Sequence, residues 1–198
     1  MYQLKQWEMY TETVAKEKMK ELLGKIIQNY RKKEDDIVKE FLESISTLLQ
    51  KYKIAQQSEK KGELKSIQFC FLNLSVLMGE FEIHIEAFDK YLYLNRNEVN
   101  GVWKADFVYQ YYSEYTAFLI KKCEQNVKDF SYKEKQELKR KAAMDFHMMV
   151  IRVISEHIVK IIELNEFQEL DVEKQGIISF GEYMGKSQPI CIWDLEKE

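Results

Sequence analysis

The fold of this chain is decided by residues 64–95, which read LKSIQFCFLNLSVLMGEFEIHIEAFDKYLYLN. In its first part Ile67, Phe69 and Phe71 alternate with smaller or polar residues, and a two-residue repeat of apolar side chains is typical of a β-strand. The sequence on either side has helical spacing instead. This stretch therefore predicts an α+β protein where an all-helical bundle would otherwise be expected.

The alternation changes phase further along the stretch, where Leu72, Leu74 and Val76 become the apolar positions. We interpret this change as a β-bulge or as a strand covered on both faces. Met78 and Gly79 then predict a turn.

A second strand is predicted after this turn, because apolar and polar residues alternate from Phe81 to Ala87. Residues 91–94 predict a third strand, and Asn100-Gly101 is typical of a hairpin turn. We therefore expect a small antiparallel β-sheet over about residues 64–103, covered on one face by helices.

Residues 2–57 carry apolar side chains at helical spacing and predict helix throughout. We expect an N-terminal helical hairpin over residues 1–57, with the charged run 31–36 as its turn. The alternative is one long helix, whose apolar stripe would need another subunit to cover it. The hairpin is expected to be a semi-independent part of a single domain spanning residues 1–198, since 198 residues is an ordinary size for one domain.

Two long C-terminal helices are predicted after the sheet. The first resumes near Trp103, and the second opens at Ser131 and Glu134, whose spacing is that of a capping box, and ends near Leu164. Beyond Gly176 the sequence becomes rich in glycine, which predicts an irregular C-terminal arm or strand that packs back on the body. The fold class is thus α+β and predominantly helical.

Composition and charge exclude several classes of function. The chain has 30 basic and 33 acidic side chains, so its formal charge of −3 does not favour nucleic acid as a partner. No stretch approaches the roughly 20 apolar residues that span a bilayer, so we expect no membrane partner. Cys70, Cys123 and Cys191 have no metal-ligand spacing and predict reduced thiols in a cytoplasmic protein.

One polar row in the second predicted strand allows two interpretations. Glu80, Glu82, His84 and Glu86 occupy alternate positions, so their side chains point to the same face. Carboxylate and imidazole ligands at Glu82, His84 and Glu86 would suit a divalent metal. We favour the interpretation that this row is the solvated face of the strand, where charges discourage edge pairing, and expect no cofactor.

The last long helix offers a second group of polar residues, His147, Arg152 and His157, which allow two interpretations. They could line a pocket, but we favour the edge of the helix stripe, with their polar ends in water. His147 and His157 are ten residues apart, about 15 Å along a helix, so they cannot share a ligand. The segment GEYMGKS (181–187) resembles a Walker A phosphate loop, but it has three residues between its glycines where that motif has four. We interpret it as a turn, and no catalytic residue can be named.

Two hypotheses for function follow. The first is a non-enzymatic interaction or regulatory protein that binds a protein partner or self-associates through its N-terminal helices or its aromatic helix. The second is an enzyme, or a binder of a small molecule or metal, with a pocket between the sheet and the C-terminal helices. We favour the first, because no arrangement of Ser, Cys and His is typical of a nucleophile with its base.

Overall fold

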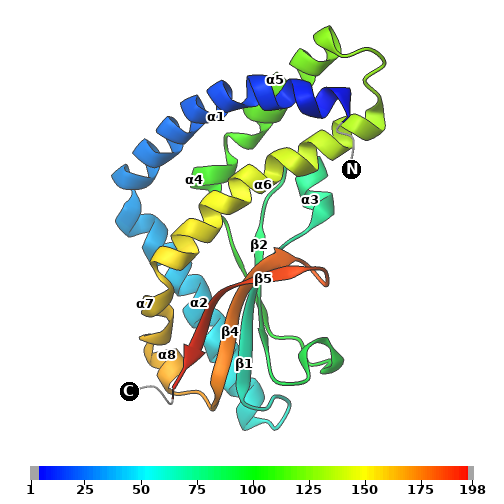
Figure 1. Ribbon diagram of the computed structural model, residues 1–198. Helices are drawn as coiled ribbons and strands as arrows, with labels where there is room; N and C mark the ends of the chain where they lie inside the picture. Colours follow the sequence, from blue (N-terminus) through cyan, green and yellow to red (C-terminus); the bar gives the residue numbers. More distant parts are fainter. Residues whose placement is uncertain (1–4, 196–198) are drawn as a thin grey trace. The chain divides into compact units, whose positions relative to one another are not determined.

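The computed structural model describes residues 5–195, which form two compact units (Figure 1). The helical unit comprises the residues up to Glu34 together with Asn73–Phe81 and Ala105–Val150. The sheet unit comprises Asp35–Leu72, Glu82–Lys104 and the residues from Ile151 onward. Each unit is assembled from three stretches of chain, so neither is one continuous segment of sequence. That residues 1–198 fold as one domain stays a prediction.

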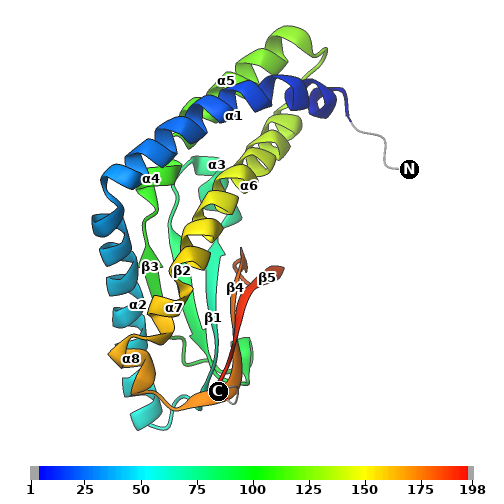
Figure 2. The same ribbon diagram turned by 60° about the vertical axis from the view of Figure 1, so that its left-hand side comes forward.

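The sheet unit contains one five-stranded sheet among the described residues, in the order β3-β2-β1-β4-β5 (Figure 2). Its strands are β1 (Leu64–Phe71), β2 (Ile83–Phe88), β3 (Asn100–Trp103), β4 (Val172–Glu182) and β5 (Ser187–Asp194). The central strand β1 pairs antiparallel with β2 but parallel with β4. The prediction of an antiparallel sheet confined to residues 64–103 was therefore wrong, since the sheet is mixed and two of its strands come from the C-terminal region.

Helix α2 (Glu34–Gln57) covers one face of this sheet. The ring of Phe41 lies 5.9 Å from that of Phe69 on β1 and 4.8 Å from that of Trp103 on β3. Asn100-Gly101, predicted as a hairpin turn, lies inside β3 instead. A Cβ atom on Gly101 would lie 3.7 Å from Leu48, an ordinary van der Waals contact, so the strand faces the helix at this position.

Two segments predicted as strands form short helices. Leu72, Leu74 and Val76 fall in or beside α3 (Asn73–Met78), which ends at Gly79 with φ 79° and a 2.8 Å hydrogen bond from its N–H to the Ser75 carbonyl. A glycine in the left-handed region is a common helix terminator. Met78-Gly79 therefore marks the end of a helix and not a turn between two strands.

Residues 91–94 are likewise not a strand, because Leu92–Leu94 form a 3₁₀ turn (η1). The Asp89 side chain accepts a 3.0 Å hydrogen bond from the Tyr91 N–H, and such a local bond favours a turn over strand pairing.

The C-terminal region forms the regular hairpin β4–β5, which corrects the predicted irregular arm. The glycines that suggested irregularity allow close approach within the hairpin. A Cβ on Gly176 would overlap the Trp193 indole at 1.8 Å, and one on Gly181 would lie 2.3 Å from the Lys186 carbonyl oxygen. The Walker-like segment is the turn of this hairpin, where the Gly185 N–H donates to the Glu182 carbonyl at 2.9 Å.

The helical unit is built around aromatic side chains. Its helices are α1 (Gln6–Lys32), α3, α4 (Asp106–Tyr109), α5 (Tyr112–Asn126) and the first part of α6 (Tyr132–Glu156). Helix α1 packs against α4 and α5. Phe81 stacks on Tyr109 with ring centroids 4.2 Å apart, and Tyr112 meets Phe146 of α6 at 5.6 Å.

The boundaries of the long helices test the sequence signals directly. The capping box is confirmed, because Ser131 N–H donates to Glu134 Oε2 at 2.8 Å and Glu134 N–H donates to Ser131 Oγ at 3.3 Å. The helix ends earlier than predicted, at Glu156, and His157 (φ −115°, ψ 12°) separates it from the short helices α7 (Ile158–Ile162) and α8 (Asn165–Gln168).

The N-terminal segment is divided into two helices at Lys33, within the charged run expected to form a turn. Helix α1 finds its apolar partners in α4 and α5, and α2 finds them in the sheet. Each helix thus has apolar partners within its own unit, and the antiparallel hairpin of the two stays a prediction.

Gly176 provides a test of the hairpin packing. Gly176→Ala is expected to lower the free energy of unfolding by about 3 kcal/mol, because the added methyl group would overlap the Trp193 ring. Gly24→Ala is the matched control: a Cβ atom added there would meet no atom within 4 Å, and alanine should stabilise helix α1 by about 0.5–1 kcal/mol. Urea denaturation measures both changes, and a neutral Gly176→Ala would contradict the packing.

Candidate functional site

The face of the sheet opposite α2 is polar yet buried. Strand register places on this face Ser66, Gln68, Cys70, His84, Glu86, Phe88 and Ser179. The residue exposures of Gln68, Glu86 and Ser179 are only 7%, 5% and 7%. Polar groups removed from water need hydrogen-bond partners or opposite charges. This face of the sheet is therefore the candidate for a functional site in the sheet unit.

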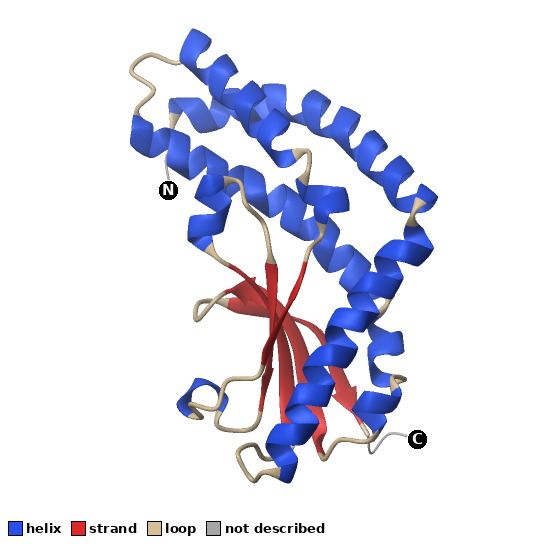
Figure 3. Cartoon of the chain, turned by 180° about the vertical axis from the view of Figure 1, so that it is seen from behind, coloured by secondary structure: helices blue, strands red, loops and turns tan. Residues whose placement is uncertain are grey.

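The loop 89–99 covers part of this face, and Figure 3 shows its 3₁₀ turn on the side of the sheet away from α2. Asp89 organises the loop by accepting hydrogen bonds from Asn95 Nδ2 at 2.6 Å, from the Tyr91 N–H and from the Gly62 N–H. Burial alone raises the pKa of Asp89, but these bonds and the charge of Lys61 outweigh it and hold the pKa below its usual value. The loop is thus anchored by a charged carboxylate.

Tyr93 connects the same loop to the sheet. Its hydroxyl donates to Gln68 Oε1 at 3.1 Å, and its ring meets that of Phe88 edge-on with centroids 4.7 Å apart. Burial, followed by the charge of Glu86, raises the pKa of Tyr93 well above its ordinary value. Tyr93 therefore stays a neutral hydrogen-bonding group at the edge of the covered face.

A cavity of about 280 Å³ lies beneath this loop. Its walls include the charged side chains Lys61, Glu86, Arg96 and Glu98, with Phe88, Tyr93 and Met184 among the other lining residues. Two positive and two negative groups therefore share one small space.

Lys61 is the most unusual group in this cavity. The residue is 6% exposed, and no residue from 5 to 195 forms an ion pair or hydrogen bond with its ammonium group; its Nζ lies 5.9 Å from the centre of the Phe88 ring. Burial lowers the pKa of Lys61, although the charges of Asp89, Glu86 and Glu98 oppose this change. A lysine this deeply buried is ordinarily paired.

Glu86 is the second buried charge of the cavity. Its carboxylate interacts with the Tyr93 hydroxyl and accepts from the Cys70 thiol at 3.8 Å, and no ion pair with Lys61 forms. Burial first, and the charge of Glu98 next, raise the pKa of Glu86 above its ordinary value. Burial likewise raises the pKa of the Cys70 thiol, which argues against Cys70 as a nucleophile.

The structure separates the three residues considered as metal ligands. Glu82 precedes β2 and lies 3.5 Å from Lys104, whereas His84 is half-buried with its ring 6.5 Å from that of Tyr183. Glu86 alone of the three lines the cavity. Within residues 5–195 no three His, Cys, Asp or Glu side chains come together in an arrangement that could hold a metal ion.

The three residues considered as pocket lining have different surroundings within their own units. His147 lies in the helical unit, fully buried, with Nδ1 2.7 Å from the Tyr109 hydroxyl, and burial lowers its pKa to about 3. Arg152 is exposed and pairs with Glu156 at 2.9 Å, while His157 is a buried residue preceding α7. None of them lines the cavity over the sheet.

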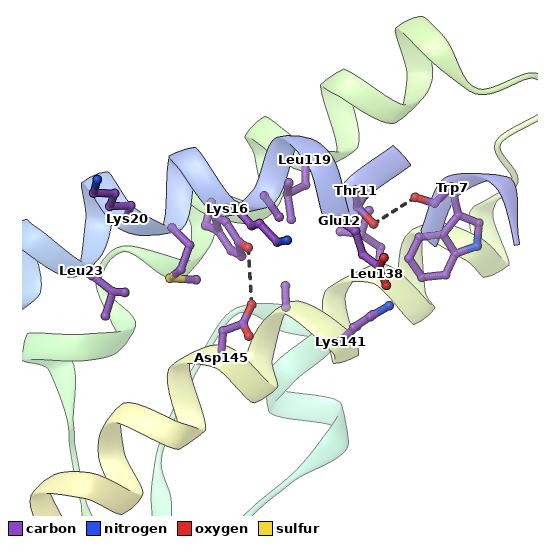
Figure 4. Close-up of a pocket in the computed structure, with 14 residues that line it drawn as sticks. Trp7, Thr11, Glu12, Lys16, Lys20, Leu23, Leu119, Leu138, Lys141 and Asp145 are labelled. Atoms are coloured by element: carbon purple, nitrogen blue, oxygen red, sulfur yellow. Dashed lines mark hydrogen bonds between the residues drawn. The ribbon is translucent and has the colours of Figure 1, made fainter. Parts of the chain in front are cut away.

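A second hollow, an open groove of about 410 Å³, lies within the helical unit between α1, α5 and α6 (Figure 4). Its sides are largely apolar, with Leu23, Leu119 and Leu138 among them, and Lys16 and Lys20 project from α1 at its rim. At its side the Tyr115 hydroxyl donates to Asp145 at 3.4 Å, the dashed line that ends at Asp145 in Figure 4. This groove lacks the unmatched buried charge that distinguishes the cavity over the sheet.

The sequence did not reveal Lys61, Tyr93 or Arg96 as residues of a site. Lys61 lies in a polar linker beside Lys60 and differs from it only in the burial that the fold creates. Tyr93 was assigned to a strand that does not form. The one usable signal was the polar row in β2, which contains Glu86.

No protein-family model matches this chain, and no curated protein or solved structure matches it either. None of the helices within residues 5–195 combines the length and apolar character needed to cross a bilayer. The function must therefore be inferred from the geometry of the chain itself.

Glu86 gives the cavity a pH-dependent effect on stability. Because its folded-state pKa is raised, its contribution to stability is present below the unfolded-state pKa and is lost as pH rises through the folded-state value. Glu86→Gln should therefore match the wild type near about pH 4 and become progressively more stable than it toward about pH 8. Urea denaturation across this range measures the difference, with exposed Glu80→Gln as control. A difference independent of pH would contradict the assignment.

Proposed function

We propose that this protein binds a small charged molecule in the cavity between the polar face of the sheet and the loop 89–99. The observation that carries the proposal is Lys61, a residue only 6% exposed that lines the cavity and whose ammonium group has no acceptor among the described residues. An unpaired buried charge costs stability, and sites that bind ligands are where such costs are commonly retained. An anionic group of a ligand would supply the missing partner.

The cavity has other properties of a ligand site. It is small and partly open, with both apolar and polar walls, and its volume lies just below the range of about 300–1,000 Å³ found for pockets of drug-sized ligands. Arg96 also lines the cavity and provides a second positively charged side chain. Since Tyr93 and Asn95 come from the covering loop, the loop is suited to ordering around a bound molecule.

This proposal differs in place from the pocket expected from the sequence. That pocket was expected between the sheet and the C-terminal helices, whereas the cavity lies between the sheet and its own β2–β3 loop. The proposal is of binding and assigns no catalytic residue. It favours the second hypothesis from the sequence over a purely structural interaction protein.

Lys61→Met tests the proposal in two ways. It should raise the free energy of unfolding at neutral pH by about 1 kcal/mol, because it replaces an unpaired buried cation with an apolar chain of similar length. It should also abolish the thermal stabilisation that anionic metabolites give the wild type in a ligand screen. Lys60→Met, at the adjacent exposed lysine, is the control and should do neither. A screen without any stabilising ligand, together with a destabilising Lys61→Met, would refute the proposal.

The protein-partner hypothesis stays a prediction of its own. If the chain self-associates through α1 or the aromatic helix α5, the groove of the helical unit is the surface to test, because its apolar sides are open (Figure 4). Leu23→Glu would then reduce the sedimentation coefficient at high protein concentration, while Leu74→Glu, an exposed position on α3, would not. A wild-type protein that sediments as a monomer at every concentration would contradict self-association.

A further inference from the structure

The ligand of the cavity can be specified further from the balance of charges around it. Lys61 and Arg96 contribute positive charge, and Glu86 and Glu98 contribute negative charge, so the lining has no net charge. An anion would satisfy Lys61 but leave Glu86 without a cation. A cation would satisfy Glu86 but leave Lys61 without an anion.

Lys61 and Glu86 do not neutralise each other. Both residues are at least 94% buried, both line the cavity, and yet no ion pair joins them. Lys61 lies near the Phe88 ring, while Glu86 is engaged by the Cys70 thiol and by Tyr93. The two charges are therefore held apart across the same small space, and a bridging group with opposite charges at its two ends would satisfy both.

The size of the cavity restricts what such a group can be. A cavity of about 280 Å³ lies at the lower end of the sizes found for ligand pockets, so it suits a compact molecule. Phe88, Val99 and Met184 provide apolar surface beside the charges. A compact molecule with a short apolar part matches these walls.

Resting on the proposed function, we infer that the ligand is a zwitterion of amino-acid size. Its carboxylate contacts Lys61 with help from Arg96, and its ammonium group contacts Glu86. Such a ligand brings no net charge into a buried space, which avoids the cost of desolvating an unmatched ion. The des-amino acid and the des-carboxy amine of the same skeleton each lose one of the two contacts.

The experiment is a binding comparison on the full chain. The standard α-amino acids are screened by thermal shift, and each one that binds is compared by calorimetry with its des-amino and des-carboxy analogues. The zwitterion should bind at least about tenfold more tightly than either analogue, since each analogue leaves one buried charge unpaired. Glu86→Gln should bring the affinities of the zwitterion and its des-amino analogue together, and Lys61→Met should do so for the zwitterion and the amine.

The controls and the contrary outcomes are distinct. Glu80→Gln and Lys60→Met remove exposed charges of the same sign outside the cavity and should leave every affinity unchanged. If the des-amino acid binds as tightly as the zwitterion, the inference fails while the proposed anion site stands. If no amino acid binds, the inference also fails, and the metabolite screen with Lys61→Met decides the proposed function separately.

Discussion

The sheet unit depends on the burial of its central strand. β1 is hydrogen-bonded to β2 on one side and to β4 on the other, and α2 covers one of its faces. Its backbone groups are thereby satisfied by neighbouring strands, and Ile67 and Phe69 enter an apolar core. The second face is also shielded, by the β2–β3 loop, although its side chains are polar. Every unusual property of the candidate site follows from that second covering.

A covered polar face is costly unless its groups are paired. Gln68 accepts a hydrogen bond from the Tyr93 hydroxyl, and Asp89 accepts three hydrogen bonds that hold the loop in place. Lys61 and Glu86 form no ion pair with each other, and both undergo the pKa displacement that burial imposes on a charged group. The roles of these polar residues therefore differ: Gln68 and Asp89 hold the loop in place, and Lys61 and Glu86 line the cavity that the loop covers.

Local signals in the sequence succeeded where the interaction itself is local. The capping box at Ser131 joins residues three apart, and the helical spacing of residues 2–57 reports a stripe along single helices. The errors arose where one signal serves two structures. Gly79 ends a helix where a turn between two strands was expected, and Gly101 lies within a strand where a hairpin turn was expected. In both cases the same residues are compatible with either local structure, and the surrounding fold decides between them.

The sequence by itself determined the α+β class, the long helices, the strand at residues 64–71 and the polar row that ends with His84 and Glu86 in β2. Only the tertiary structure decided that β1 pairs in parallel with a strand more than 100 residues later, because the alternation of side chains is the same for either strand direction. It also decided that Glu86 is buried while Glu82 is exposed, and that Lys61 joins Glu86 in one cavity. Burial is a property of what covers a residue, and here the cover is a loop whose position depends on Asp89 and Tyr93 rather than on the row itself.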